Sequence, residues 1–282
     1  MQIKLTYQKI TVIIFLGVLS TLNSQDLSVL SYNIRYPSTE DGPNLWEQRK
    51  ATMAQVLKDL KPDIMGLQEV VHSQLITLSE DLADYTYVGV GREDGKTKGE
   101  YSPIFYLKKE LKLLESNTFW LSETPNQISR GWDAALERIC TYAHFLHLKS
   151  GREFWVFNTH FDHRGVEARA QSVRLILNQI KKLNLKGRPI VLTGDFNLTP
   201  DEEPIEILQT NLEDIQEKLE KNAPNYGTFT GFDTATNGER RIDYIFQKGF
   251  KVSKSSHLWF KTEKGLWVSD HHPVYGEFLF VN

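Results

Sequence analysis

The chain has 282 residues, of which 40% are hydrophobic and 11% aromatic, as in an ordinary globular protein with a sizeable core. Its one cysteine, Cys140, excludes an intrachain disulfide, and the apolar residues around it indicate a core position rather than a nucleophile. The net charge of −3 argues against a protein that mainly binds long nucleic acids, because such binding depends on Lys and Arg side chains that neutralise phosphates.

The start of the chain has the pattern of an export signal. Two lysines precede a mostly apolar stretch at residues 10–19, and small or polar residues follow. This stretch is shorter than the roughly 20 residues of a membrane-spanning helix. We therefore expect residues 1–24 to be a signal peptide, and residues 25–282 to be a periplasmic or extracellular domain with no stable membrane span. An uncleaved membrane anchor is the alternative interpretation.

A strand, a helix and a second strand are predicted next. Residues 27–33 (LSVLSYN) have the composition of a buried strand. Residues 47–60 carry apolar side chains at helical spacing, and Pro62 disfavours helix at the residue before it. Residues 63–69 (DIMGLQE) form an apolar run that ends in a carboxylate. The order strand, helix, strand indicates a βαβ unit.

Strands dominate the rest of the chain. Residues 139–148 and 153–160 flank a short turn that contains Gly151, which predicts a hairpin. A long helix is predicted over residues 166–183, where apolar residues share one face. Further strands are predicted at residues 190–193, 241–247, 250–259 and 273–281. No linker, repeat or low-complexity tract divides the chain, so we expect one α/β sandwich of two packed sheets with helices outside.

Polar residues interrupt this apolar pattern at five ends of predicted strands and inside one strand. These segments are Ser31-Tyr32-Asn33, Gln68-Glu69, Asn158-Thr159-His160, Gly194-Asp195-Phe196-Asn197, Arg241-Ile242-Asp243-Tyr244 and Ser269-Asp270-His271-His272. Each one alone is explained by a turn, a cap, a core histidine or a surface loop. Together they indicate a functional site, because buried ionisable groups are unfavourable unless they are paired or bound to metal, and ligands gather at strand ends.

The order and wording of these motifs resemble the endonuclease/exonuclease/phosphatase superfamily. The matching segments are SYNIR (31–35), LQEV (67–70), NTHFDH (158–163), GDFN (194–197), RIDYIF (241–246) and SDHHPV (269–274). The resemblance implies a four-layer α/β sandwich, with two packed, mostly antiparallel sheets flanked by helices. It also implies hydrolysis of a phosphate ester by in-line attack of an activated water. It does not specify the substrate, because the superfamily includes nucleases, sphingomyelinases and phosphatases.

The resemblance further implies a divalent ion held by Asn33 and Glu69, with Asp270 close enough to contribute. Carboxylate and amide oxygens suit a hard cation, so we expect Mg²⁺, with Mn²⁺ as its substitute, rather than Zn²⁺. A phosphate ester repels an incoming hydroxide. Its hydrolysis therefore requires a cation, a base for the water and donors for the phosphoryl oxygens.

Five residues receive catalytic roles from the same resemblance. Asp195 is expected to orient and deprotonate the water, and Asn197 to donate a hydrogen bond to the phosphoryl group. His160 and His271 are expected to bracket the phosphate with N–H donors. Asp243 is expected to fix the tautomer of His271. The division of acid and base roles between Asp195 and His271 is open in the superfamily, and we favour Asp195 as the base.

Three residues outside these roles are candidates for binding substrate. Trp132 lies in a loop without periodicity, where an aromatic ring can stack on a base or a sugar, although it can equally plug a sheet end. Arg164 follows the NTHFDH motif directly. Together with Arg138 it could clamp a terminal phosphate bidentately.

Two functions of different classes remain open. The first is a phosphoesterase: a nuclease, a sugar or nucleotide phosphatase, or a lipid phosphodiesterase. Its substrate would be a small molecule or a single-stranded nucleic acid, with long duplex DNA disfavoured by the charge. The second is a catalytically inactive binding or adhesion module on the same fold. Such a module should have lost some motif residues, and none is lost. A serine hydrolase is excluded because the G-x-S-x-G motif is missing.

Overall fold

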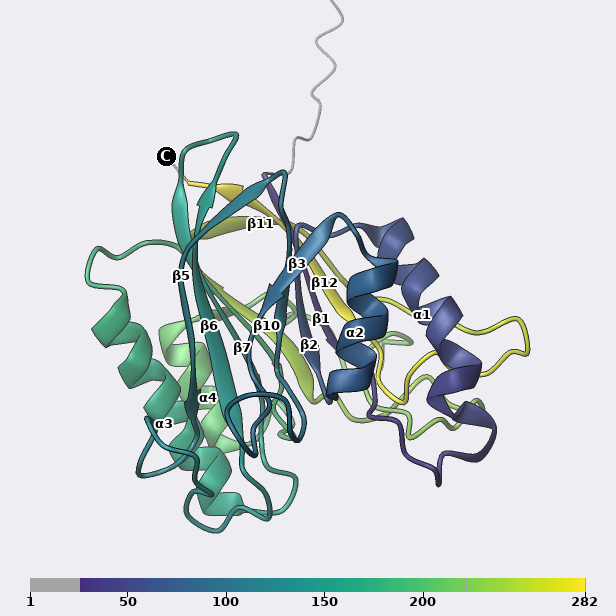
Figure 1. Cartoon of the computed structure of the whole chain (residues 1–282). Helices are drawn as coiled ribbons and strands as arrows, with labels where there is room; N and C mark the ends of the chain where they lie inside the picture. Colours follow the sequence, from purple (N-terminus) through teal and green to yellow (C-terminus); the bar gives the residue numbers. More distant parts are fainter. Residues whose placement is uncertain (1–25, 222, 282) are drawn as a thin grey trace, which may run out of the picture.

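Two sheets of six strands pack face to face (Figure 1). The first sheet consists, in spatial order, of β11 (Phe250–His257), β12 (Val274–Phe280), β1 (Leu27–Asn33), β2 (Ile64–Gln68), β4 (Ile104–Leu107) and β3 (Tyr85–Val88). The second consists of β5 (Leu111–Trp120), β6 (Ile139–His147), β7 (Glu153–His160), β8 (Ile190–Asp195), β10 (Asp243–Lys248) and β9 (Glu213–Asp214). The computed structural model describes residues 26–221 and 223–281, so the predicted signal peptide lies outside the described residues.

Each sheet contains one parallel pair of strands, β1 with β2 and β7 with β8, and its other pairs are antiparallel. A helix connects each parallel pair: α1 (Trp46–Leu60) follows β1, and α3 (Val166–Leu183) follows β7. Both segments are therefore βαβ units, as parallel neighbours require a crossover connection. The βαβ unit expected near the start of the chain is confirmed.

The helices cover the outer faces of the two sheets, which makes four layers (Figure 1). α1 and α2 (His72–Asp81) lie on the first sheet, while α3 and α4 (Glu203–Asn211) lie on the second. Three apolar cores result, one between each pair of adjacent layers. In β1, Val29 points into the core between the sheets, and Leu30 points toward the helices. Because both faces of β1 are buried, the strand reads as a continuous apolar run. The fold class expected from the resemblance is confirmed.

The end of α1 shows how local sequence sets an element boundary. Lys61 adopts a left-handed conformation with φ 43°, and its N–H donates to the carbonyl of Leu57. Pro62 follows and cannot continue the helix. The helix therefore ends at Leu60, the predicted residue, and it begins one residue earlier than expected.

Hydrogen bonds between buried polar side chains and backbone groups connect the two sheets. The Asn158 amide oxygen accepts hydrogen bonds from Gln68 Nε2 at 2.7 Å and from Thr193 Oγ1 at 3.0 Å. Its amide nitrogen donates to the carbonyls of Leu67 at 2.7 Å and Pro103 at 2.9 Å. Asn158 belongs to the NTHFDH motif, and these bonds give it a structural role between the sheets.

Several elements were not predicted, and others have bounds that differ from the predicted ones. β5 was missed because many of its side chains are exposed or half-buried, which removes the apolar run. α2 and α4 were also missed, and both are short helices of 10 and 9 residues. β8 continues to Asp195 and β10 begins at Asp243, where the polar ends remain paired across the sheet. Among the described residues, no helix combines the length and the apolar character needed to cross a membrane.

Candidate active site

Six strand ends meet at one edge of the sandwich. β1, β2, β7 and β8 end there, and β10 and β12 begin there, because an antiparallel strand starts where its neighbour stops. Asp195 at the end of β8 lies opposite both His160 of β7 and Asp243 of β10 in the strand register. The topology thus brings distant motifs together around a cavity of about 420 Å³.

Asn33 is a central hydrogen-bond donor of the site. Its amide nitrogen donates to Glu69 Oε1 at 3.0 Å and to Asp195 Oδ2 at 3.0 Å. It also lies 3.4 Å from His271 Nε2, which cannot accept a hydrogen bond when that ring carries both protons. Its amide oxygen accepts the backbone N–H of Arg35 at 3.0 Å. This last bond fixes the orientation of the amide, because the opposite orientation would set two N–H donors against each other. Asn33 therefore presents N–H groups, not its oxygen, to the carboxylates.

Glu69 and Asp270 face the cavity from the first sheet. The backbone N–H of Tyr36 donates to Glu69 Oε2 at 3.1 Å, which holds this carboxylate in place. Arg35 lies 3.9 Å from each of the two carboxylates and is bound more tightly to Asp41, at 2.8 Å. Burial, and then the charge of nearby Glu69, raise the pKa of Asp270 to about 6 despite the nearby His271 and Arg35.

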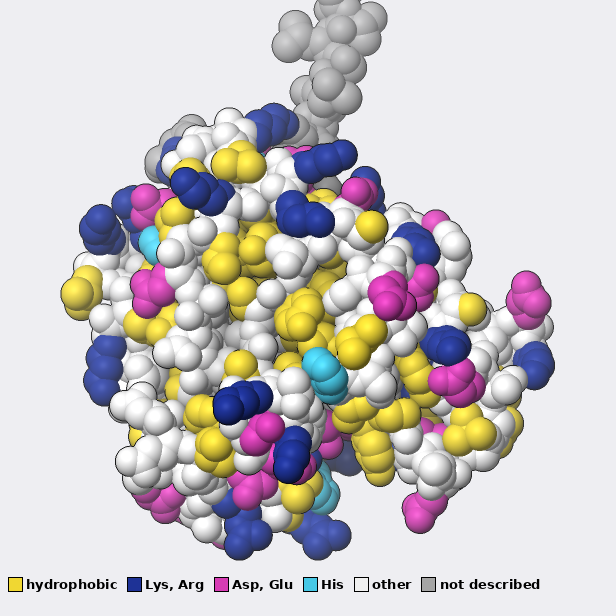
Figure 2. All heavy atoms as spheres, in the orientation of Figure 1, with side chains coloured by type: hydrophobic (Ala, Val, Ile, Leu, Met, Phe, Trp, Pro, Cys, Tyr) yellow, Lys and Arg dark blue, Asp and Glu magenta, His cyan; other side chains and the backbone are white. Residues whose placement is uncertain are grey.

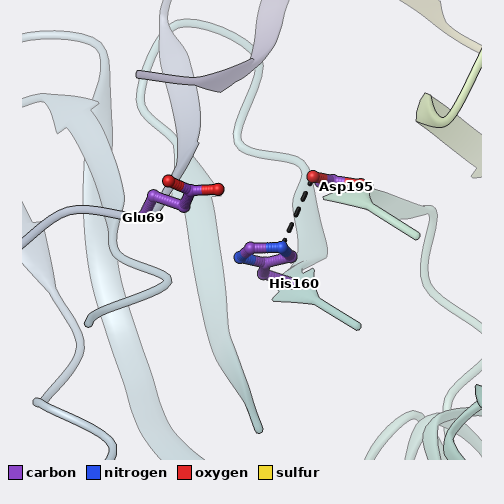
Figure 3. A group of neighbouring side chains, drawn as sticks. All are labelled: Glu69, His160 and Asp195. Carbon is purple, nitrogen blue, oxygen red and sulfur yellow. Dashed lines mark ion pairs between the residues drawn. The ribbon is translucent and has the colours of Figure 1, made fainter. Parts of the chain in front are cut away.

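The second sheet contributes Asp195, His160 and Asn197. Figure 3 shows Glu69, His160 and Asp195 facing a common space, and His160 Nε2 lies 3.4 Å from Asp195 Oδ2. Ligand atoms of these three side chains lie within 4.8 Å of one another, close enough to share a metal ion. The backbone N–H of Asn197 donates to Asp195 Oδ1 at 2.9 Å, and its amide nitrogen lies 3.2 Å from His160 Nε2.

The two histidines differ in charge. His271 Nδ1 lies 2.8 Å from Asp243 Oδ2. Burial opposes the positive charge of His271, but the carboxylates of Asp243 and Asp195 outweigh it and raise its pKa to about 10. For His160, burial and the charge of Arg138 lower the pKa to about 3, although Asp195 acts in the other direction. At neutral pH the ring of His271 is therefore an imidazolium, and that of His160 is neutral.

Asp195 is fully buried, and burial followed by the charge of Asp243 raises its pKa above the ordinary value. A carboxylate with a raised pKa is a better proton acceptor. His271 already holds its proton, so it serves as a donor in this state and not as a base. The electrostatics favour the expected division of roles, with Asp195 as base, and the roles themselves remain predictions.

Three residues at this edge have a left-handed backbone, which is unusual for residues other than glycine. The φ angles are 60° for Arg35, 60° for Glu69 and 52° for Asn197. Such conformations are strained by about 1–3 kcal/mol each and persist where the surroundings enforce them, often at functional sites. All three residues line the cavity.

Two of the predicted substrate-binding residues lie away from the cavity. Arg164 is exposed, and within the described part of the chain neither it nor Trp132 belongs to the cavity lining. The loop that contains Trp132 is bound to the start of α3. Asp133, the next residue, accepts the N–H of Ala168 in the first turn of that helix at 2.7 Å. The expected clamp of Arg138 and Arg164 on one phosphate stays a prediction, and only Arg138 of the two lines the cavity.

Arg138 does line the cavity, but with partners of its own. Its Nε lies 3.4 Å from Asp162 Oδ2, and its Nη2 lies 3.1 Å from His163 Nδ1. Asp162 also accepts the N–H groups of Arg164 and Gly165. Asp162 thus organises the loop after β7, which fixes Arg138 at the cavity wall.

The cavity lining also includes residues to which the sequence analysis gave no role. They are Arg35, Tyr36, Glu100, Leu136, Phe229, Arg240 and Ile242. Arg35 stands within the SYNIR segment, so its position next to Asn33 was a usable signal. Glu100 and Leu136 lie in loops with no recognisable pattern, and only the tertiary structure brings them to the site. Cys140, by contrast, is fully buried in β6, and burial raises the pKa of its thiol, as expected for a core residue.

The sandwich and its cavity of carboxylates, amides and histidines define a class: hydrolases of phosphoester bonds. The chain belongs to the Endonuclease/Exonuclease/phosphatase family, whose family model matches residues 30–271. The resemblance inferred from the motifs is thereby confirmed.

Among solved structures, the chain is similar to a mannosyl-6-phosphatase from Bacteroides thetaiotaomicron VPI-5482. The two are 39% identical with a TM-score of 0.84, over 90% of this chain and 100% of the other. A family member from Bacteroides vulgatus is also 39% identical, with a TM-score of 0.82 over 90% of this chain and 99% of the other. Mouse nocturnin is 25% identical over 83% of this chain, and the match spans 59% of nocturnin.

Proposed function

We propose that this protein is a Mg²⁺-dependent phosphatase that hydrolyses a phosphomonoester of a small molecule by in-line attack of water. One observation carries the proposal. Asn33, Glu69, Asp195 and His271 come from four separate segments, yet Asn33 Nδ2 lies within 3.4 Å of atoms of the other three. An inactive binding module would have no reason to keep these groups converged and buried.

The donor set fits a hard divalent cation. Glu69, Asp195 and Asp270 bring three carboxylates to one cavity, and burial raises the pKa values of Asp195 and Asp270. A cation would relieve this concentration of negative charge, and oxygen ligands favour Mg²⁺ or Mn²⁺. Glu69 and Asp270 would hold it. The orientation of the Asn33 amide favours a supporting role for Asn33 over direct ligation.

When bound, the ion would neutralise charge on the phosphoryl oxygens and on the water. The protein's own groups would then act around the phosphate. Asp195 would orient the attacking water and accept its proton, while Asn33 steadies the Asp195 carboxylate. The imidazolium of His271, backed by Asp243, would donate to the phosphoryl oxygens where charge develops. Asn197 and His160 would supply further donors from the opposite side.

The size and charge of the site favour a small substrate. A cavity of about 420 Å³ lies within the range of small-molecule pockets. On the face shown in Figure 2, basic and acidic side chains are interspersed and form no continuous basic track. A long nucleic acid would require such a track. The similarity to the mannosyl-6-phosphatase supports a sugar phosphate as the substrate class. The similarity to nocturnin and to a probable RNA exonuclease of Saccharomyces cerevisiae makes a nuclease the second candidate.

A substrate panel with Mg²⁺, and again with EDTA, tests the proposal. We expect Mg²⁺-dependent release of phosphate from mannose 6-phosphate and p-nitrophenyl phosphate, with slower or no cleavage of bis-p-nitrophenyl phosphate and single-stranded oligonucleotides. The variant Asp195→Asn should lower kcat by roughly a hundredfold or more, because it removes the base. Activity that survives EDTA, or a preference for oligonucleotides over phosphomonoesters, would contradict the proposal.

We also propose that the protein is exported and that residues 1–24 are removed. The support is the sequence pattern at the start of the chain, which lies outside the described residues. Mass spectrometry of the protein recovered from a bacterial periplasm or medium tests this, since an N-terminus upstream of Ser20 would refute the cleavage.

A further inference from the structure

Glu100 lies in the wall of the cavity on the far side of His160 from Asp195. Its carboxylate Oε2 is 3.7 Å from His160 Nδ1, while His160 Nε2 faces Asp195 Oδ2 at 3.4 Å. The next residue, Tyr101, donates its backbone N–H to the carbonyl of Val70 at 2.7 Å. This bridge anchors Glu100 beside the strand end that bears Glu69, so its position is set by the fold.

Arg92 fixes the orientation of the Glu100 carboxylate. Arg92 donates from Nη1 to Oε2 at 2.8 Å and from Nη2 to Oε1 at 3.0 Å. Arg92 is itself buried, and the indole N–H of Trp120 donates to its carbonyl at 2.8 Å. Glu100 lies too far from His160 for a good hydrogen bond. Its carboxylate oxygens accept up to about four hydrogen bonds, so the two bonds from Arg92 leave Glu100 able to accept more at the cavity wall.

Arg138 brings hydrogen-bond donors to the cavity that Glu100 also lines. Its side chain is only 5% exposed. Nε and Nη2 have partners, but among the described residues Nη1 is a buried atom without a hydrogen-bond acceptor. A buried guanidinium N–H without an acceptor is unfavourable, so a ligand oxygen would satisfy it. Leu136, with 38% of its surface exposed, adds an apolar contact at the same wall.

We propose that Glu100 and Arg138 form a subsite for neighbouring hydroxyl groups on the leaving group of the substrate. The inference rests on the proposed phosphatase function and narrows it to phosphomonoesters of polyols, such as sugars. A hydroxyl is both a donor and an acceptor. Glu100 accepts the hydroxyl proton, and Arg138 Nη1 donates to the oxygen of the same or the adjacent hydroxyl. Leu136 contacts the C–H face of the polyol.

The same carboxylate selects against a second phosphate on the leaving group. A carboxylate in a partly buried wall repels another anion and offers it no hydrogen-bond donor. Arg92 offsets part of this repulsion, because its guanidinium pairs with the carboxylate, but both of its terminal nitrogens already donate to Glu100. The subsite therefore distinguishes a hydroxylated monophosphate from a bisphosphate of the same sugar.

The variant Glu100→Gln tests the subsite by keeping the shape of the side chain and removing its charge. With Mg²⁺ present, we expect kcat/KM for mannose 6-phosphate to fall by roughly tenfold, because a charge-assisted hydrogen bond is weakened. For p-nitrophenyl phosphate, whose leaving group has no hydroxyls to bind, kcat/KM should change by less than about twofold. For mannose 1,6-bisphosphate, kcat/KM should rise.

Glu93→Gln is the matched control, because Glu93 is an exposed carboxylate of the same loop and does not line the cavity. It should leave all three values unchanged. An equal loss on both monophosphates in Glu100→Gln would overturn the subsite, since it would indicate an effect on the reacting phosphate. The subsite would be overturned as well if Glu100→Gln kept the wild-type ratio of kcat/KM for mannose 6-phosphate to kcat/KM for p-nitrophenyl phosphate. If the variant does not fold, kcat/KM of the wild-type enzyme is compared for mannose 6-phosphate and n-propyl phosphate, which has no hydroxyl groups on its leaving group. Equal values would refute the proposal.

These outcomes are separate from a failure of the proposed function. Wild-type protein that releases no phosphate from p-nitrophenyl phosphate with Mg²⁺ would refute the phosphatase itself. Wild-type protein that hydrolyses p-nitrophenyl phosphate but shows no preference for hydroxylated substrates would refute only the subsite.

Discussion

Two histidines share one cavity but hold different numbers of protons, and their neighbours account for the difference. His271 faces Asp243 and Asp195, whose charges outweigh burial and raise its pKa to about 10. His160 is buried near Arg138, and its pKa falls to about 3. One histidine is thus a charged donor and the other a neutral one at the same pH, which gives the site an asymmetric field around the phosphate.

The variant Asp243→Asn tests the role of the Asp243 carboxylate in keeping His271 charged. The substitution removes the carboxylate that most strongly raises the pKa of His271, so kcat should fall roughly tenfold to a hundredfold. In the wild type, the protonated form is lost only as pH rises through about 10. In the variant, the alkaline limb of the kcat–pH profile should move to lower pH. Measurement of kcat from pH 6 to 10.5 checks both effects.

The control for this variant is Asp59→Asn, which removes an exposed carboxylate on α1 that does not line the cavity. Its profile should match that of the wild type. If Asp243→Asn lowered kcat with no displacement of the alkaline limb, the charge of Asp243 would not be what keeps His271 protonated.

At the scale of elements, the close approach of the two sheets positions the site. A Cβ at Gly66 of β2 would lie 2.0 Å from Thr193 Oγ1 of β8 and 2.8 Å from Asn158 Oδ1 of β7. The three residues are next to the polar bonds that pin the sheets together. Glycine is therefore required here for space between the sheets, while its conformational freedom is not the reason.

Gly66→Ala should destabilise the protein by about 1–3 kcal/mol, the usual range for overpacking a filled core. It should also lower activity, because separation of the sheets displaces Glu69 from Asp195. Chemical denaturation measures the first effect. A second substitution in the same chain, Thr193→Ala, removes Oγ1, the atom closest to the new Cβ. The free energy of unfolding of the double variant should therefore be higher than the sum of the two single effects predicts. Strict additivity would argue against a clash at this position.

At the scale of the whole molecule, buried neutral histidines make folding sensitive to acid. His257 of β11 is 5% exposed, and its Nδ1 lies 2.8 Å from the carbonyl oxygen of Asn225. Burial, and then the charge of Arg241, lower its pKa to about 4 from an ordinary 6.5. The unfolded chain therefore takes up the proton first as pH falls. The stability that His257 contributes is complete above 6.5 and is lost as pH falls toward 4.

We expect the free energy of unfolding to decrease between pH 6.5 and pH 4, and His257→Gln to reduce the slope by on the order of 1 kcal/mol per pH unit. The slope should not vanish, because burial also lowers the pKa of His272 to about 4. Urea denaturation at pH 7, 6 and 5 in both proteins checks this. Parallel curves for wild type and variant would contradict the role of His257.

Much of the architecture followed from local patterns. β1, β7 and α3 occupy the predicted residues, because their apolar periodicity is complete and their ends are marked by polar or glycine residues. β5 escaped prediction because its side chains alternate irregularly between exposure and burial. An edge strand of this kind is defined by its pairing with β6, which no local pattern records.

The sequence by itself determined the family, the fold class and the identity of the polar groups, because the ends of apolar strands carry ionisable residues that only a shared site explains. Tertiary structure alone decided which of them meet. It turned the Asn33 amide nitrogen toward the carboxylates, left Arg164 outside the cavity and brought Glu100 into it. The physical reason is that charge and hydrogen bonding depend on distances of a few ångströms between segments far apart in the chain, and only the packing of the two sheets sets those distances.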